Sequence, residues 1–362
     1  MKERRKRNMS RTGLLFMFCL LMLCGCAQIT GFMENTEVSG REVESLAAEK
    51  EDDTVLLGGM PVGIYMETDG VLVLDTEKMT GVDGKEYTPA QGVVSSGDYI
   101  TEVNHQKIEG KKQLMDLVEH LDGEKVLLTV RRENTILEKK LTPVQISKGN
   151  YRLGIWVRDN VQGLGTITFL TKNNRFAALG HGIHDIDTST LLTIKRGTLY
   201  RTSIQKVQKG SKGNPGTMEG IIVYNRFHRL GVIEKNTDAG IYGELNSDRS
   251  WIGEEVPIQV AKKEEIKTGE ARIRCYIDGE VKEYTICITQ IDKESDQVNK
   301  GMVIQVTDTE LLEKTGGIIQ GMSGSPIIQN GKLIGAVTHV FVQDSTKGYG
   351  IFIENMLKEE ES

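Results

Sequence analysis

Residues 321–326 read Gly-Met-Ser-Gly-Ser-Pro and are the stretch of the chain best suited to nucleophilic chemistry. Apolar residues lie on both sides of this stretch, and an Asn-Gly turn at 330–331 leads into another apolar run. The pattern predicts a strand, a glycine-rich elbow and a second strand. Gly321 permits a sharp fold, so the amides of Gly321 and Ser323 can point at one spot and form an oxyanion hole. Ser323 is therefore the candidate nucleophile, and Ser325 is its rival.

A histidine between two glycines can supply the base that such a serine needs. His181 follows an apolar run, at the expected end of a strand, and has a glycine on either side. A serine hydroxyl is a poor nucleophile at neutral pH until a nearby imidazole accepts its proton. We interpret His181 as the candidate general base and His184, three residues later, as its competitor. The chemistry expected of the Ser323–His181 pair is acyl transfer.

A carboxylate is then needed to hold the imidazole in the correct tautomer, and the residues leave two candidates open. Asp308 ends an alternating strand pattern fifteen residues before Ser323, and it also reads as the N-cap of a short helix. Asp238 lies nearer the middle of the interval between His181 and Ser323, as in two-barrel digestive peptidases.

The first 54 residues read as a leader and a linker. Residues 1–28 combine a basic start with an apolar stretch at 13–25, which is short for a membrane-spanning helix and typical of an export signal or anchor. Leu-Cys-Gly-Cys at 23–26 resembles a lipoprotein box, so Cys26 is a candidate for lipidation. Residues 29–54 are polar and acidic, and we interpret them as a linker.

Residues 55–147 predict a small domain of short strands with one helix over 110–121. The stretch 96–104, Ser-Gly-Asp-Tyr-Ile-Thr-Glu-Val-Asn, resembles the characteristic strand of a bacterial PDZ domain. Such a domain binds a peptide segment by adding it to a sheet edge beside the helix. The expected peptide-binding loop comprises Val62, Gly63 and Ile64.

Residues 148–362 alternate short strands with glycine-rich turns, which predicts a mainly β fold: a chymotrypsin-like double β-barrel after the PDZ domain. A hairpin turn at 278–279 sets Cys275 opposite Lys282, so no disulfide to Cys287 is predicted. No Cys/His spacing suggests zinc, and no cofactor is expected. The net charge of −6, without a basic run in the body of the chain, argues against nucleic acid as a partner.

Several motifs together resemble the stage IV sporulation protein B peptidase family of spore-forming bacteria, whose members are exported serine peptidases with an N-terminal PDZ domain. The resemblance covers about residues 54–357 and is carried by residues 154–159, 165–169, 178–182, 213–216, 316–331 and 336–341. It implies a catalytic triad of His181, Asp308 and Ser323.

The resemblance also implies a regulatory role. It implies export to the space between the forespore and mother-cell membranes, with membrane association through the leader. There such an enzyme cleaves itself and then a membrane-bound regulator of an intramembrane protease that activates a late sigma factor. The alternatives are an inactive PDZ and peptidase-like protein that tethers a partner at the membrane, or an esterase with the same nucleophile.

Overall fold

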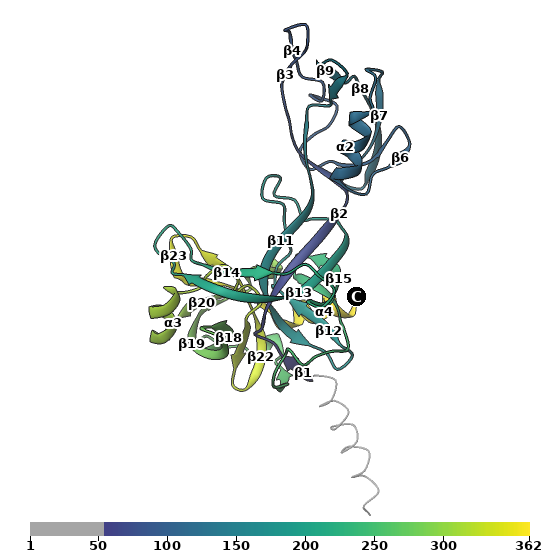
Figure 1. Ribbon diagram of the computed structural model, residues 1–362. Coiled ribbons are helices and arrows are strands. Elements are labelled where there is room, and N and C mark those ends of the chain that lie inside the picture. The colour runs from purple at the N-terminus through teal and green to yellow at the C-terminus, as the bar shows by residue number, and fades with distance from the viewer. Residues whose placement is uncertain (1–53) are drawn as a thin grey trace, which may run out of the picture. The chain divides into compact units, whose positions relative to one another are not determined.

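The computed structural model describes residues 54–362, which consist mainly of strands (Figure 1). The expected mainly β fold is confirmed. The predicted leader, linker residues 29–53 and Cys26 lie outside the described residues. Between 54 and 362, none of the helices has both the length and the apolar character that a membrane span requires.

Six antiparallel strands close into a first barrel. In order around the ring they are β2 (Pro61–Thr76), β11 (Ile155–Leu170), β12 (Arg175–Ala178), β16 (Gly240–Leu245), β15 (Arg229–Thr237) and β13 (Ile194–Gln208), which returns to β2. Side chains that alternate along the strands fill the interior, among them Val62, Ile64, Ile167 and Phe176.

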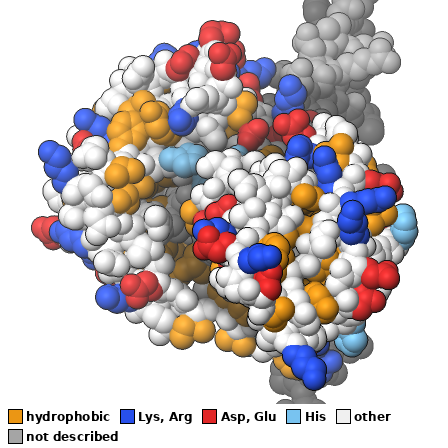
Figure 2. All heavy atoms as spheres, turned by 90° about the horizontal axis from the view of Figure 1, so that it is seen from above, with side chains coloured by type: hydrophobic (Ala, Val, Ile, Leu, Met, Phe, Trp, Pro, Cys, Tyr) orange, Lys and Arg blue, Asp and Glu red, His pale blue; other side chains and the backbone are white. Residues whose placement is uncertain are grey.

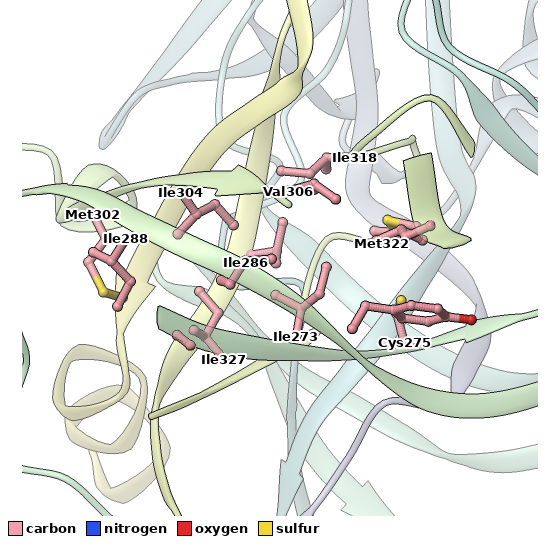
Figure 3. Packing of buried hydrophobic residues seen from close by; sticks show 14 of the residues in the cluster. Ile273, Cys275, Ile286, Ile288, Met302, Ile304, Val306, Ile318, Met322 and Ile327 are labelled. Carbon is pink, nitrogen blue, oxygen red and sulfur yellow. The ribbon is translucent and has the colours of Figure 1, made fainter. Parts of the chain in front are cut away.

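A second ring of six antiparallel strands follows along the chain. It runs through β18 (Gly269–Ile277), β19 (Glu280–Ile291), β20 (Met302–Val306), β23 (Asp344–Phe352), β22 (Lys332–Phe341) and β21 (Pro326–Gln329), which pairs again with β18. Isoleucines dominate its core (Figure 3). The predicted hairpin register is confirmed, since Cys275 pairs with Lys282, and both Cys275 and Cys287 are free thiols.

Short elements join the two barrels. β1 (Thr54–Leu57) pairs with β11 and with β17 (Pro257–Val260), which lies beside β22. The C-terminal helix α4 (Ile353–Glu361) contacts strands of both barrels. β14 (Thr217–Ile222) extends β13 as a hairpin, and α3 (Thr309–Thr315) precedes the serine elbow. The short helices η1 (Lys263–Glu265) and η2 (Val298–Lys300) lie in connections.

The PDZ-like domain is inserted into the first barrel. β2 and β11 stay paired beyond the barrel and run together into a separate lobe (Figure 1). The lobe contains β3 (Met79–Thr80), β4 (Glu86–Tyr87), β5 (Tyr99–Val103), β6 (Gln106–Lys107), α2 (Lys111–Glu119), β7 (Val126–Arg132), β8 (Thr135–Leu141), β9 (Val144–Ser147) and β10 (Asn150–Arg152). Its core is its own and extends from Val71 to Leu153.

The insertion changes the expected boundaries. Residues 55–66 were expected to begin the PDZ domain, but Met60, Val62, Ile64 and Met66 pack in the core of the first barrel. The reason is that β2 pairs with β13 along Val62–Thr68 as well as with β11, so its first half is a barrel strand.

On the face drawn in Figure 2, acidic and basic side chains are intermixed over the surface.

Candidate active site

The serine elbow is anchored by its neighbour Met322. The Met322 side chain is fully buried in the core of the second barrel, beside residues of β18 and β20 (Figure 3). Because Met322 faces the core, Ser323 next to it is only half-buried. Ser325, the rival nucleophile, is fully buried, and its hydroxyl has no hydrogen-bond partner among the described residues. The geometry therefore favours Ser323.

Hydrogen bonds from one amide and two threonine hydroxyls of β11 hold the elbow. The Thr166 amide donates to the Ser323 carbonyl at 2.9 Å, and the Thr166 hydroxyl donates to the Gly321 carbonyl at 2.8 Å. The Thr168 hydroxyl donates to the Gly324 carbonyl at 2.8 Å. Among the hydrogen bonds of residues 54–362, none uses the amide of Gly321 or of Ser323 as donor. These two amides, predicted as the oxyanion hole, remain available to a ligand.

The histidine turn approaches the elbow backbone to backbone. Leu179 and Gly180 follow β12 with positive φ angles of 72° and 67°, which reverse the chain before His181. A Cβ added to Gly324 would lie 2.0 Å from the Thr166 carbonyl oxygen and 2.5 Å from the Leu179 amide nitrogen. Only glycine permits this contact, and it brings the two sequence motifs together across the barrels.

Burial lowers the pKa of His181 below its usual 6.5. The Gly182 carbonyl acts in the opposite direction, and His184 lowers the pKa further. Nδ1 of His181 lies 2.9 Å from the Gly182 carbonyl oxygen. A carbonyl can only accept, so Nδ1 carries the proton and Nε2 is left with the free lone pair. A neutral imidazole with a free Nε2 is the form that a general base requires.

Ser323 and His181 line one cavity of about 350 Å³ between the barrels. The Ser323 hydroxyl donates to the backbone carbonyl of Thr338 at 2.7 Å, so it must rotate before it can donate to His181. His339, next to Thr338, packs its ring 4.5 Å from that of His181. Desolvation of the charged ring, followed by the neighbouring His181, lowers the pKa of His339 to about 4.

The structure does not bring Asp308 to the imidazole. Asp308 caps α3, where its carboxylate accepts from the Leu311 amide at 3.1 Å and from the Thr285 amide at 3.2 Å. The cap geometry turns the carboxylate toward the helix, and the Gly182 carbonyl occupies Nδ1 of His181 in its place.

The competing residues Asp238 and His184 lie near each other. His184 also neighbours His181, since Nδ1 of His184 is 3.2 Å from the same Gly182 carbonyl oxygen that Nδ1 of His181 contacts. One oxygen of Asp238 is 3.7 Å from Nε2 of His184. Within residues 54–362, no carboxylate forms a hydrogen bond with the His181 ring. The pair is exposed, with 67% of the Asp238 side chain accessible, and forms a surface contact at the rim of the site.

Asn236 is a residue of the site that the sequence analysis missed. Its side chain accepts from the Ile183 amide at 2.8 Å and donates to the carbonyls of Ile183 and Leu192 at 2.9 and 3.0 Å. These bonds hold both ends of the loop that follows His181. A polar residue next to the end of strand β15 was the only sequence signal available.

Val62, Gly63 and Ile64, the expected peptide-binding loop, do not form a loop. They lie in the interior of β2 and pair with β11 on one edge and β13 on the other. Val62 and Ile64 are buried, so these residues have no free edge to offer a peptide. The expectation was wrong because β2 belongs to the barrel at this point.

The groove of the PDZ-like domain lies elsewhere. A cavity of about 540 Å³ separates α2 from the segment 152–157 that leads into β11. Leu114 and Met115 line the helix side, and Leu153, Gly154 and Trp156 line the other. Trp156 is 60% exposed and Gly154 has a φ of +69°. An apolar-Gly-apolar sequence after a turn was the signal that could have located this groove.

Three solved structures are similar in part. The PDZ domain of the SdrC-like protein from Listeria monocytogenes is 24% identical and covers 25% of this chain and 87% of that chain, with a TM-score of 0.20. The HtrA-type protease AlgW with tripeptide is 13% identical and covers 54% of each chain, with a TM-score of 0.33. The inactive form of the Mycobacterium tuberculosis protease Rv3671c is 14% identical and covers 56% of this chain and 85% of that chain, with a TM-score of 0.31.

Among curated proteins, one from Helicobacter pylori whose name describes it as a zinc metalloprotease is 28% identical over 180 residues. The match covers 43% of this chain and 50% of that protein, so the chain spans about half the length of the curated relative. The family model described as SpoIVB peptidase S55 matches residues 149–357, which is more than half of the chain. This chain belongs to the SpoIVB peptidase S55 family.

Proposed function

We propose that the chain is a serine endopeptidase in which Ser323 attacks the peptide carbonyl and His181 serves as general base. The observation that carries the proposal is that both side chains line one cavity beside two amides that have no acceptor among residues 54–362. Family membership supports the same reaction class. An imidazole that burial keeps neutral is suited to the role of base at neutral pH.

The proposed reaction starts when substrate enters the cavity and the Ser323 hydroxyl leaves the Thr338 carbonyl. Nε2 of His181 takes the hydroxyl proton as Oγ bonds to the carbonyl carbon. The amides of Gly321 and Ser323 then stabilise the oxyanion, where such donors are worth about 3–4 kcal/mol each. His181 gives the proton to the leaving amine. Water then attacks the acyl-enzyme carbonyl with His181 again as base, and His181 passes the proton to Oγ of Ser323 as the ester bond breaks.

The resemblance supports a more specific proposal about the substrate. We propose that the chain cleaves itself and then a membrane-bound regulator of an intramembrane protease, and thereby triggers activation of a late sigma factor. We also propose export through residues 1–28 to the space between the forespore and mother-cell membranes, and peptide binding at the PDZ-like domain. The export-like composition of the leader and the groove beside α2 support these steps.

A fluorophosphonate probe tests the enzymatic proposal on the full chain. The probe reacts with an activated serine, so the parent and Ser325→Ala are expected to be labelled, while Ser323→Ala and His181→Ala are not. The parent is also expected to trim itself, and both Ser323→Ala and His181→Ala are expected to remain full length. Equal trimming in all variants, or no labelling of the folded parent, would instead support the inactive tethering protein.

A further inference from the structure

Within the described part of the chain, no Asp, Glu, Lys or Arg side chain lines the cavity beside Ser323. Of the described residues that line it, only His181 and His339 are ionisable. The remaining side chains are mostly aliphatic and come from both barrels: Ile64, Val161, Leu164, Ile183, Ile319 and Val340. Burial, the largest cause of the low pKa of His181, also disfavours another charge placed beside its ring.

Two segments of the second barrel enclose the part of the cavity nearest the nucleophile. Residues 318–320 lead into the elbow, and residues 338–340 lie on β22 opposite them. Ile318 is buried, and a Cβ added to Gly348 would lie 2.7 Å from its Cδ1 atom. Ile318 therefore fills the space beside Gly348, and the wall that it contributes to the cavity is apolar.

A neighbouring cavity has the opposite character. It has a volume of about 1330 Å³, shares His339 with the first, and is lined by charged residues of both signs, among them Asp238, Asp296, Lys300 and Lys358. Charged substrate residues thus have a polar region available beyond His339. Of these two cavities, only the one beside Ser323 favours an apolar side chain of the substrate.

From this contrast we propose that the residue whose carbonyl is attacked carries an aliphatic side chain, such as Val, Leu, Ile or Met. The inference rests on the proposed peptidase function and specifies its substrate class. In an acyl transfer the side chain on the attacked carbonyl lies beside the nucleophile, in the pocket that sets specificity. An aliphatic group gains about 0.8 kcal/mol per buried CH₂, whereas an ammonium or carboxylate loses hydration without a partner.

A set of fluorogenic peptides that differ only at the residue before the scissile bond tests this inference. With the full chain, kcat/KM for Val and Leu peptides is expected to exceed that for Lys and Asp peptides by about a hundredfold or more. Similar values for the charged and aliphatic peptides, with Ser323 still labelled by a fluorophosphonate, would overturn the specificity and leave the peptidase proposal standing. Failure of both labelling and cleavage would overturn the peptidase proposal itself.

A charged substitution in the wall of the cavity beside Ser323 provides a second test of the inference. Val340→Asp sets a carboxylate in the half-buried wall and is expected to raise the Lys-to-Leu ratio of kcat/KM at least about tenfold. Val342→Asp is the matched control, because Val342 is 54% exposed, lies two residues further along and does not line the cavity. Fluorophosphonate labelling confirms that each variant is folded. An unchanged ratio in labelled Val340→Asp, or equal changes in both variants, would contradict the assignment of this wall.

Discussion

The serine elbow and the histidine loop are held in place by different kinds of contact. The elbow takes part mainly through its own main-chain groups: its Gly324 amide donates to the Val337 carbonyl, and its Ser323 carbonyl accepts from the Thr166 amide. Its Gly321 and Gly324 carbonyls accept from the hydroxyls of Thr166 and Thr168. The closest contact of the elbow with the first barrel exists because Gly324 has no side chain. The nucleophile is therefore located by the backbone of the elbow and by its bonds to the main chain and the threonine hydroxyls of β11.

The histidine loop has main-chain bonds of its own, such as that from the Leu192 amide to the Ile183 carbonyl, and it depends in addition on side chains from other elements. Asn236 of β15 bonds its two ends, and Arg158 of β11 pairs with the buried Asp185 and with Asp187. Leu192 at the end of the loop packs against Leu72 and Tyr99 of the inserted lobe. The comparison indicates that substitutions can weaken the position of the base without disturbing the nucleophile.

The largest effect is expected from Gly324→Ala, which disrupts the backbone contact between the serine elbow and the histidine turn. The added Cβ meets the Thr166 carbonyl at 2.0 Å, so the barrels must separate there, and we expect kcat/KM to fall at least about a thousandfold. Gly331→Ala is the control, because Gly331 also has positive φ but nothing lies within 4 Å of its Cβ position. Both incur about 1–3 kcal/mol of backbone strain. Equal losses of activity in the two variants would show that strain alone, and not the contact, matters.

A smaller effect is expected from Asn236→Ala, which removes three hydrogen bonds from the histidine loop. At about 1 kcal/mol for each bond, kcat is expected to fall tenfold to a hundredfold while KM changes little. Asn246→Ala, which removes a single bond to the Arg229 carbonyl, is the control and is expected to leave kcat near that of the parent. A change confined to KM, or to thermal stability, would contradict the positioning role.

Arg158→Gln removes the pairing of the loop with β11, and we expect about a tenfold loss of kcat together with faster hydrogen exchange over residues 182–193. The exposed Arg196–Glu67 pair on the same barrel offers a control, since Arg196→Gln breaks an ion pair that does not touch the loop. Unchanged exchange in the Arg158 variant would show that the barrels alone hold the loop.

The pH profile of kcat/KM reports the base in the free enzyme. Because burial lowers the pKa of His181, the imidazole stays neutral to lower pH than usual, and the acid limb is expected below pH 6.5. His184→Gln removes a neighbouring group that lowers this pKa, so the limb is expected to move slightly upward. A limb above pH 6.5 would require a carboxylate beside His181, in conflict with the geometry described above.

Features that depend on neighbouring residues could be predicted from the sequence. Features that depend on pairing between distant residues could not. The elbow around Ser323 and the register that sets Cys275 opposite Lys282 follow from neighbouring residues, and both could be predicted. The place of Val62 in the barrel depends on pairing with residues more than 100 positions away, and the same alternating pattern suits a strand in either sheet. Asn236 was missed because its partners lie 44 and 53 residues away.

The smallest effect is expected from Asp308→Asn, which tests whether the family triad operates in this geometry. Asparagine caps a helix about as well as aspartate, so stability should change little, whereas Asp308→Ala should cost about 1 kcal/mol. Since Asp308 makes its bonds to Leu311 and Thr285, kcat/KM of the Asn variant is expected to stay within a few-fold of the parent. A loss of about a thousandfold or more in a variant of unchanged melting temperature would mean that the carboxylate reaches His181 during the reaction. In that case the helix cap would have to open as substrate binds, and the base would depend on α3 as well as on its own loop.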